Sequence, residues 1–159
     1  MAARADYAAA LLENEAGRAV LGALTDLLKS DEYLLQVNAN ERAISFRLAT
    51  HLRSYLPEWD IDCEYNRDGV EPKRIRHLGL NPHADDDEGQ TVFPDIIAHR
   101  RGTRDNYLVI ELKKSTNTVP RDVDYDKLAG YKAQLGYKFA LFIELGVEET
   151  FGKISIEWI

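Results

Sequence analysis

The sequence has little cysteine and no long apolar run. Cys63 is its single cysteine among 159 residues, so no disulfide can form within the chain. No stretch approaches the roughly 18 apolar residues that span a membrane. The first residues, MAARADYAAALLENEAG, mix acidic and basic side chains and do not follow a secretory pattern. These absences predict a soluble, cytoplasmic protein without a membrane partner.

An excess of positive charge is also missing. The formal net charge is −7, whereas proteins that bind nucleic acid non-specifically usually display a broad basic surface. The charges are unevenly distributed, because arginine and lysine gather in the middle third of the chain and an acidic run occupies residues 85–88. The sequence therefore argues against a broadly basic surface but permits a small, local basic face.

Length and composition indicate one domain. Hydrophobic residues make up 45% and charged residues 30% of the chain, which is ordinary for a globular protein able to bury a core. No repeat or interdomain linker is visible. We expect an N-terminal helical extension at 1–35, a core at 36–145 and a C-terminal strand at 146–159.

Apolar residues at helical spacing predict three helices. The first covers residues 6–30. The second begins at an N-cap, either Asn38 or Asn40, and is ended by Pro57. The third covers residues 123–135, with Gly136 as its C-cap, and carries Lys127, Tyr131 and Gln134 along one polar stripe. Between the helices lie segments typical of strands.

We expect strands over residues 60–66, 73–78, 92–99, 107–114, 137–145 and 153–159. In the first of these, the alternation places Cys63 on the apolar face, as a small core residue rather than a nucleophile. The second would carry Lys73 and its basic neighbours outward. The continuous apolar run at 137–145 predicts a strand covered on both faces. The Asp-rich segment at 79–91 is expected to be a solvated loop, since it lacks the ligand spacing of an EF-hand.

The hairpin formed by residues 92–114 carries the most informative side chains. Strand alternation places Asp95 on one face of the first strand, and Glu111 and Lys113 on one face of the second together with Tyr107. Burying Glu111 and Lys113 in the apolar run LVIELKK would be costly without a partner. Either a structural ion pair or a metal site satisfies this requirement. Two carboxylates suffice for Mg²⁺, which keeps several of its waters.

Glu41 lies on the inward stripe of the second helix. Its position allows a capping box with Asn38, in which the carboxylate reaches back to a backbone N–H. It equally allows an inward carboxylate that serves a polar site at the edge of the core. His99 shares a face with Asp95 and is expected either as a structural histidine or at the edge of such a site.

Pro94-Asp95 followed by Glu111-Leu112-Lys113 resembles the motif of the PD-(D/E)XK nuclease superfamily. The resemblance covers roughly residues 36–145 and implies an α/β fold, the restriction-endonuclease-like αβββαβ core, with a central mixed sheet flanked by helices and an extra N-terminal helix. It implies that Asp95, Glu111 and the main-chain carbonyl of Leu112 bind Mg²⁺ or Mn²⁺, and that Lys113 is catalytic.

The resemblance also assigns supporting roles. Glu41 matches a helix-borne Glu that assists the metal site, and Lys127 and Gln134 match polar residues that face substrate phosphates. The basic turn at Arg100 and Arg101 could contact phosphates as well.

The implied function is that of a Mg²⁺-dependent nuclease, with DNA favoured over RNA. A role in DNA repair or phage defence would fit such a small enzyme, and a homodimer would let it cut two strands. The alternative is a nuclease fold that has lost catalysis and serves as a binding or accessory module.

Overall fold

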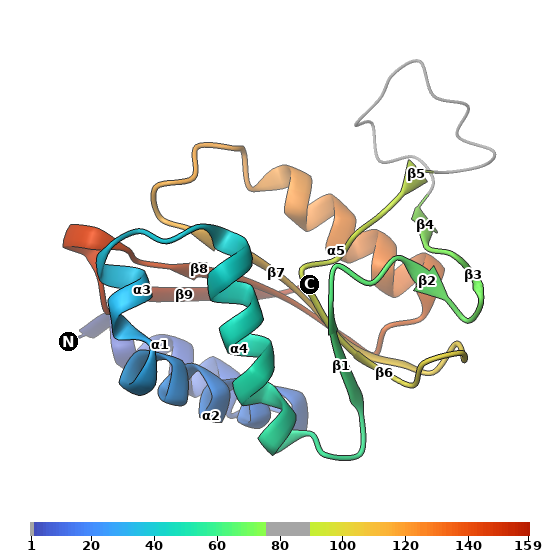
Figure 1. The fold of residues 1–159 in the computed structure, drawn as a ribbon, viewed down its shortest axis with the longest axis horizontal. Coiled ribbons are helices and arrows are strands. Elements are labelled where there is room, and N and C mark those ends of the chain that lie inside the picture. The colour runs from blue at the N-terminus through green and yellow to red at the C-terminus, as the bar shows by residue number, and fades with distance from the viewer. Residues whose placement is uncertain (1, 76–89) are drawn as a thin grey trace.

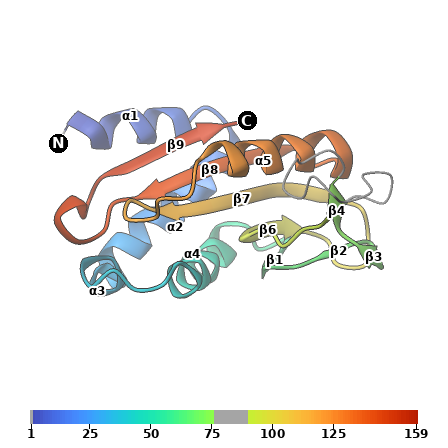
Figure 2. The same cartoon turned by 90° about the horizontal axis from the view of Figure 1, so that it is seen from above.

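The structure, a computed structural model, describes residues 2–75 and 90–159. Its centre is a five-stranded mixed sheet in the order β1-β6-β7-β8-β9 (Figure 1). The strands are β1 (Asp60–Cys63), β6 (Ile96–His99), β7 (Asn106–Lys114), β8 (Phe139–Leu145) and β9 (Ile154–Trp158). Only β7 and β8 run parallel; the other pairs are antiparallel. Seen from above, the strands follow one another from β9 to β1 (Figure 2).

Helices cover both faces of this sheet. One face bears α1 (Ala2–Leu11), α2 (Glu15–Ser30), α3 (Glu32–Gln36) and α4 (Glu41–Tyr55), and the other bears α5 (Asp122–Leu135). Short ladders join β2 (Arg67–Asp68) to β3 (Glu71–Pro72) and β4 (Arg74–Ile75) to β5 (Gln90–Thr91), and a 3₁₀ helix spans Glu148–Thr150. The expected mixed α/β sheet flanked by helices is confirmed. No helix within the described residues is long and apolar enough to cross a bilayer.

Two apolar clusters hold the layers together. Leu27 of α2 and Leu48 of α4 pack in the larger cluster on Ile110 of the sheet. On the other face, Leu128 of α5 packs with Val109 in the smaller cluster. Alternate residues of β8 belong to opposite clusters, so the prediction of a strand covered on both faces is confirmed.

The N-terminal helix is interrupted, so the prediction of one helix over 6–30 is wrong. A second helix, α2, begins after Asn14, which is its N-cap: the Asn14 Oδ1 accepts a hydrogen bond from Gly17 N at 2.7 Å. The Leu11 carbonyl oxygen comes so close that a Cβ at Gly17 would lie 2.0 Å from it. Both helices contribute buried side chains to the larger cluster, including Leu11 and Leu24.

The other two helices match their predicted ranges closely. Asn40, rather than Asn38, caps α4, because its Oδ1 accepts from Ala43 N at 2.8 Å. Asn38 has φ 55° and lies before the helix. Helix α5 ends as predicted at Gly136, which adopts the left-handed conformation with φ 71°.

The strands differ more from expectation. β1 ends at Cys63, because Glu64 takes a left-handed conformation with φ 51°. β6 begins only at Ile96, and the expected pairing over 92–95 is absent from this strand. A bulge between β6 and β7 turns Tyr107 into the larger cluster beside Leu108, so its predicted place beside Val109 is wrong.

Two side chains are placed opposite to expectation. Lys73 is fully buried rather than directed outward, because the chain around β4 folds against α5. Cys63 is exposed rather than in the core, at the end of β1 where the sheet opens into a pocket. The acidic run at 85–88 lies outside the described residues.

Candidate active site

Asp95 and Glu111 meet on the sheet face that α5 covers. Ile96 pairs with Ile110, so the two acidic residues are cross-strand neighbours at the start of β6. Asp95 Oδ2 accepts a hydrogen bond from the Leu112 N–H at 2.8 Å. The two carboxyl groups also interact with each other, since each contributes to the pKa shift of the other. Glu111 is 2% exposed, so this is a closely spaced and desolvated carboxyl pair.

Burial dominates the electrostatics of this pair. It raises the pKa of Asp95, although the hydrogen bond from Leu112 opposes the shift. Burial and the neighbouring charge of Asp95 together raise the pKa of Glu111 well above its ordinary value. The positive charge of Lys127 lowers the pKa of both groups. Burial therefore favours the protonated form of the pair, whereas a bound cation would favour its ionised form.

Lys113 is held on the same face by an acidic residue of α5. Its Nζ lies 3.4 Å from Asp124 Oδ2, and Asp124 is 1% exposed. That Asp124 oxygen has no hydrogen-bond partner among the described residues. The lysine is thus drawn towards α5 while staying partly open to solvent.

Tyr131 supports the pair from α5. Its hydroxyl donates to Glu111 Oε1 at 3.0 Å, and its side chain is fully buried. The predicted polar stripe is therefore divided: Tyr131 belongs to the core and Lys127 is half-buried. Gln134 is exposed in the last turn of α5, beyond Tyr131.

Glu41 does not form the capping box with Asn38. Its Oε2 accepts from Lys114 N at 2.7 Å, and its Oε1 accepts from Asn117 Nδ2 at 2.8 Å. The carboxylate thus joins the first turn of α4 to the end of β7. It also lines a pocket of about 360 Å³ together with Asp95 and Cys63, so Glu41 lies at the edge of the same site.

Cys63 lines this pocket without the properties of a nucleophile. Desolvation, followed by the charges of Asp62 and Asp95, raises the pKa of its thiol to about 11. At neutral pH the thiol is protonated and weakly reactive. His99 is a structural residue, with Nε2 2.7 Å from Asp62 Oδ2.

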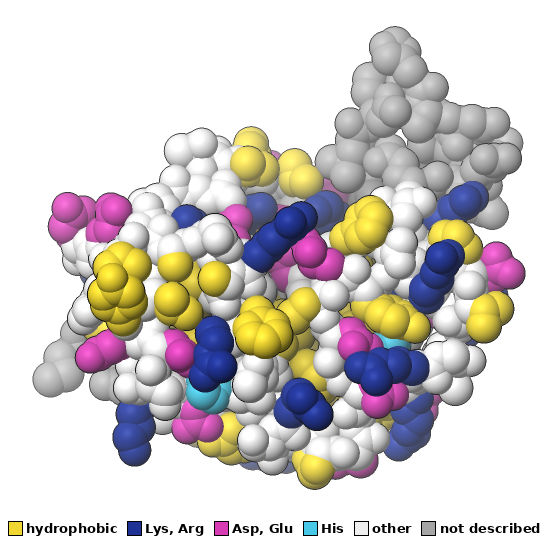
Figure 3. All heavy atoms as spheres, viewed as in Figure 1, with side chains coloured by type: hydrophobic (Ala, Val, Ile, Leu, Met, Phe, Trp, Pro, Cys, Tyr) yellow, Lys and Arg dark blue, Asp and Glu magenta, His cyan; other side chains and the backbone are white. Residues whose placement is uncertain are grey.

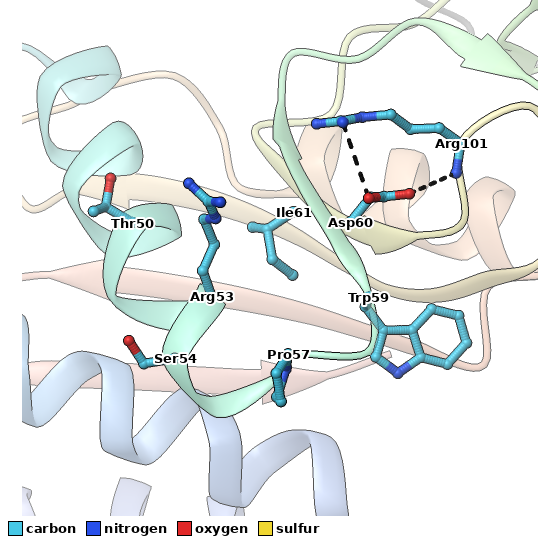
Figure 4. Close-up of a pocket in the computed structure, with 8 residues that line it drawn as sticks. All are labelled: Thr50, Arg53, Ser54, Pro57, Trp59, Asp60, Ile61 and Arg101. Carbon is cyan, nitrogen blue, oxygen red and sulfur yellow. Dashed lines mark hydrogen bonds and ion pairs between the residues drawn. The ribbon is translucent and has the colours of Figure 1, made fainter.

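Arg100 and Arg101 lie at the opposite end of β6 from Asp95. Arg100 contacts Asp105 at 2.6 Å and stacks over Trp59. Arg101 donates to both carboxylate oxygens of Asp62, at 2.6 and 2.9 Å, and lines a different pocket (Figure 4). The structure does not bring these two residues together with the carboxyl pair.

The residues present fit a divalent cation through two carboxylates. Among residues 2–75 and 90–159, no group of three or more His, Cys, Asp or Glu side chains could hold a metal ion. Two carboxylates still suit Mg²⁺, because this ion keeps several waters. A bound cation would also relieve the repulsion within the Asp95–Glu111 pair.

Asp124 is the site residue that sequence reasoning missed. Its spacing of four residues from Leu128 and seven from Tyr131 places all three on the buried stripe of α5. An acidic residue at the spacing of the apolar stripe was the signal in the sequence that could have identified Asp124 as a site residue.

No family model, no curated protein and no solved structure matches this chain. The case for its function therefore rests on the site described above.

Proposed function

We propose that this protein is a metal-dependent nuclease of the PD-(D/E)XK type that hydrolyses phosphodiester bonds in DNA. The observation that carries the proposal is the pair of buried Glu111 and half-buried Asp95 with Lys113 beside it on one sheet face. Buried carboxyl groups forced together without an ion pair are costly. Such clusters are typical of functional sites rather than of structural cores.

Mg²⁺ bound by Asp95 and Glu111, with the Leu112 carbonyl as a further oxygen, would lower the pKa of a water and neutralise charge on the phosphate. Within the chain, Asp124 directs the Lys113 ammonium towards the site. There it can orient the attacking water or stabilise the charge that develops on the phosphate. Tyr131 fixes the orientation of Glu111, and Glu41 fixes the end of β7.

The test is cleavage of plasmid and of single-stranded DNA with and without Mg²⁺ or Mn²⁺. We expect metal-dependent cleavage that falls by about 10²–10³-fold in Lys113→Met. Lys114→Met is the matched control, since the adjacent lysine points to the other face of the strand, and it should keep its activity. Cleavage that persists in both Asp95→Asn and Lys113→Met would refute the proposal. Binding of DNA by a folded wild-type protein that never cleaves would favour the accessory module instead.

Ligand assignment is tested separately by calorimetry with Mn²⁺. Glu111→Gln keeps the shape and the hydrogen bond from Tyr131 but removes the charge. We expect its Mn²⁺ affinity to fall at least about tenfold, because a metal needs the ionised carboxylate. An unchanged affinity would exclude Glu111 as a ligand.

A further inference from the structure

A groove between α4 and β1 leads away from the carboxyl pair. The two elements run in opposite directions (Figure 1), and two pockets follow one another between them. The first, beside Asp95, is lined by Arg42 and Phe46 from the start of α4. The second has a volume of about 680 Å³ and is lined by Thr50 and Arg53 from later turns of the same helix. We call this surface the α4–β1 groove.

One stripe of α4 lines the groove along its whole length. Arg42, Phe46, Thr50 and Arg53 are separated by four, four and three residues, which places them on one helix face. At 1.5 Å per residue, Arg42 and Arg53 stand about 16 Å apart along the helix. The surface in Figure 3, seen as in Figure 1, shows basic and apolar side chains lying next to one another on this face.

The far pocket presents donors suited to an anion. Arg53 is exposed and has no ion pair or hydrogen bond within the described parts of the chain. Figure 4 shows Arg53 on α4 and Arg101 on the hairpin at the two sides of this pocket, with Ile61 between them. Arg101 is already oriented by Asp62. The oriented Arg101 and the exposed Arg53 face one space, where their guanidinium groups can bind a phosphate beside the Asp60 carboxylate that also lines the pocket.

The near pocket presents an aromatic ring and an exchangeable cation. Phe46 is 60% exposed although it lines the pocket that contains Asp95. Arg42 pairs with Glu64 at 3.2 Å, but the two side chains are 83% and 43% exposed. Such exposed pairs are weak, so Arg42 can move to a phosphate. An exposed aromatic ring beside basic groups is the usual arrangement for stacking an unpaired base.

We propose that the α4–β1 groove binds an unpaired nucleic-acid strand that leads away from the phosphate at the carboxyl pair. This proposal rests on the proposed nuclease function. Phe46 stacks on a base, and Arg53 with Arg101 binds a phosphate farther along the strand. At the roughly 3.4 Å rise of a fully base-stacked strand, the distance from Arg42 to Arg53 corresponds to about five nucleotides, and an extended strand covers it with fewer. An intact duplex would leave Phe46 without a partner, because its bases are already stacked.

The test measures binding separately from cleavage. Fluorescein-labelled single strands of 3, 6 and 12 nucleotides and a 12-base-pair duplex are titrated, without metal, into a Lys113→Met background. Fluorescence anisotropy reports the dissociation constants. Arg53→Glu and Phe46→Ala are compared with Arg18→Glu, which reverses an exposed charge on α2, outside the groove.

We expect the 12-nucleotide strand to bind at least tenfold more tightly than the 3-nucleotide strand and than the duplex. Arg53→Glu should weaken binding of the long strand by at least tenfold and of the short strand much less. Phe46→Ala should weaken it about 5–100-fold, and Phe46→Trp should restore it. Arg18→Glu should leave it unchanged.

Equal binding in Arg53→Glu, Phe46→Ala and Arg18→Glu would overturn the groove assignment, as would a preference for the duplex. Cleavage by the wild-type protein separates the two proposals. If the wild type cleaves but the groove variants bind normally, the nuclease stands and the groove fails. If the groove variants lose binding but the wild type never cleaves, the groove is supported and the nuclease fails.

Discussion

Buried ionisable side chains occur in two places in this protein, around the Asp95–Glu111 pair and at Lys73, and their surroundings differ. Around Asp95 and Glu111, two groups have a defined partner from α5: Tyr131 donates to Glu111 and Asp124 faces Lys113. Lys73 is as deeply buried, but its described polar partner is the Tyr137 hydroxyl at 2.7 Å. The first group combines charges of both signs beside a pocket. The second is a single charge inside the apolar packing under α5.

Asp124 should act as a positioning residue for Lys113. In Asp124→Asn, the attraction that holds the ammonium is lost, and we expect kcat to fall about 10–100-fold. The melting temperature should also fall, because the largely buried Lys113 ammonium loses the ion-pair partner that the structure shows, so kcat is measured below the unfolding transition. Mn²⁺ affinity measured by calorimetry should stay the same. Asp122→Asn, an exposed neighbour on the same helix turn, is the control. Equal activities of the two variants would argue against this role.

Lys73 should make stability depend on pH in the alkaline range. Burial lowers its pKa from 10.5 to about 8 in the folded protein. Between about pH 8 and 10.5 the unfolded chain therefore binds more protons, so the free energy of unfolding rises with pH there and is level below pH 8. Lys73→Met should remove this rise and stabilise the protein at pH 7 by about 1–3 kcal/mol.

Urea unfolding at pH 7, 8, 9 and 10 measures this effect, with Lys29→Met, at an exposed position of α2, as the control. The difference between Lys73→Met and the wild type should shrink as pH rises. A constant difference would show that Lys73 does not titrate as its surroundings indicate.

At the scale of elements, Glu41 ties the helix α4 to the end of β7. The two hydrogen bonds that its carboxylate accepts come from Lys114 and Asn117, more than 70 residues away in the chain. These bonds fix the end of the strand that carries Glu111 and Lys113. The first residue of α4 therefore stabilises the strand that carries the site. The Glu41 side chain also lines the pocket beside Asp95.

Glu41→Ala should destabilise the protein by about 1–3 kcal/mol, because two donors lose a charged acceptor. It should also lower cleavage, as the end of β7 loses its support. The matched control is Glu32→Ala, since Glu32 is likewise the first residue of a helix but is exposed. Chemical denaturation compares the two. Equal losses of stability in the two variants would assign the effect to the helix dipole rather than to the hydrogen bonds with Lys114 and Asn117.

At the scale of the whole molecule, the N-terminal helices are part of the main core. Tyr7 and Leu11 of α1 are buried in the cluster that also holds Leu48 and Ile110. The indole N–H of Trp158 in β9 donates to the Ala10 carbonyl at 3.2 Å. Helix α1 therefore covers the β9 edge of the sheet, whereas the carboxyl pair lies between β6 and β7.

Leu11→Ala should accordingly cost about 2–4 kcal/mol of stability, as expected for a fully buried leucine. Leu12→Ala is the matched control, because the adjacent leucine is 54% exposed. Thermal unfolding should separate the two variants by several degrees, while cleavage below the transition stays near that of the wild type. Equal melting temperatures would mean that α1 is only loosely attached.

The sequence by itself determined the features that follow from local periodicity and chain geometry. Helices α4 and α5, the strands β7 and β8, and the shared face of Glu111 and Lys113 were all predicted, because spacing along one element decides which side chains lie together. The mixed sheet with helices on both faces was implied by the resemblance of the motif-bearing segment to a known family.

Only the tertiary structure decided which elements face one another. The contacts of Asp124 with Lys113, of Tyr131 with Glu111 and of Glu41 with Lys114 join separate elements. The bulge at Tyr107 and the burial of Lys73 likewise depend on the packing of neighbouring segments. Periodicity carries no information about such partners, because long-range packing overrides the local preferences that spacing records.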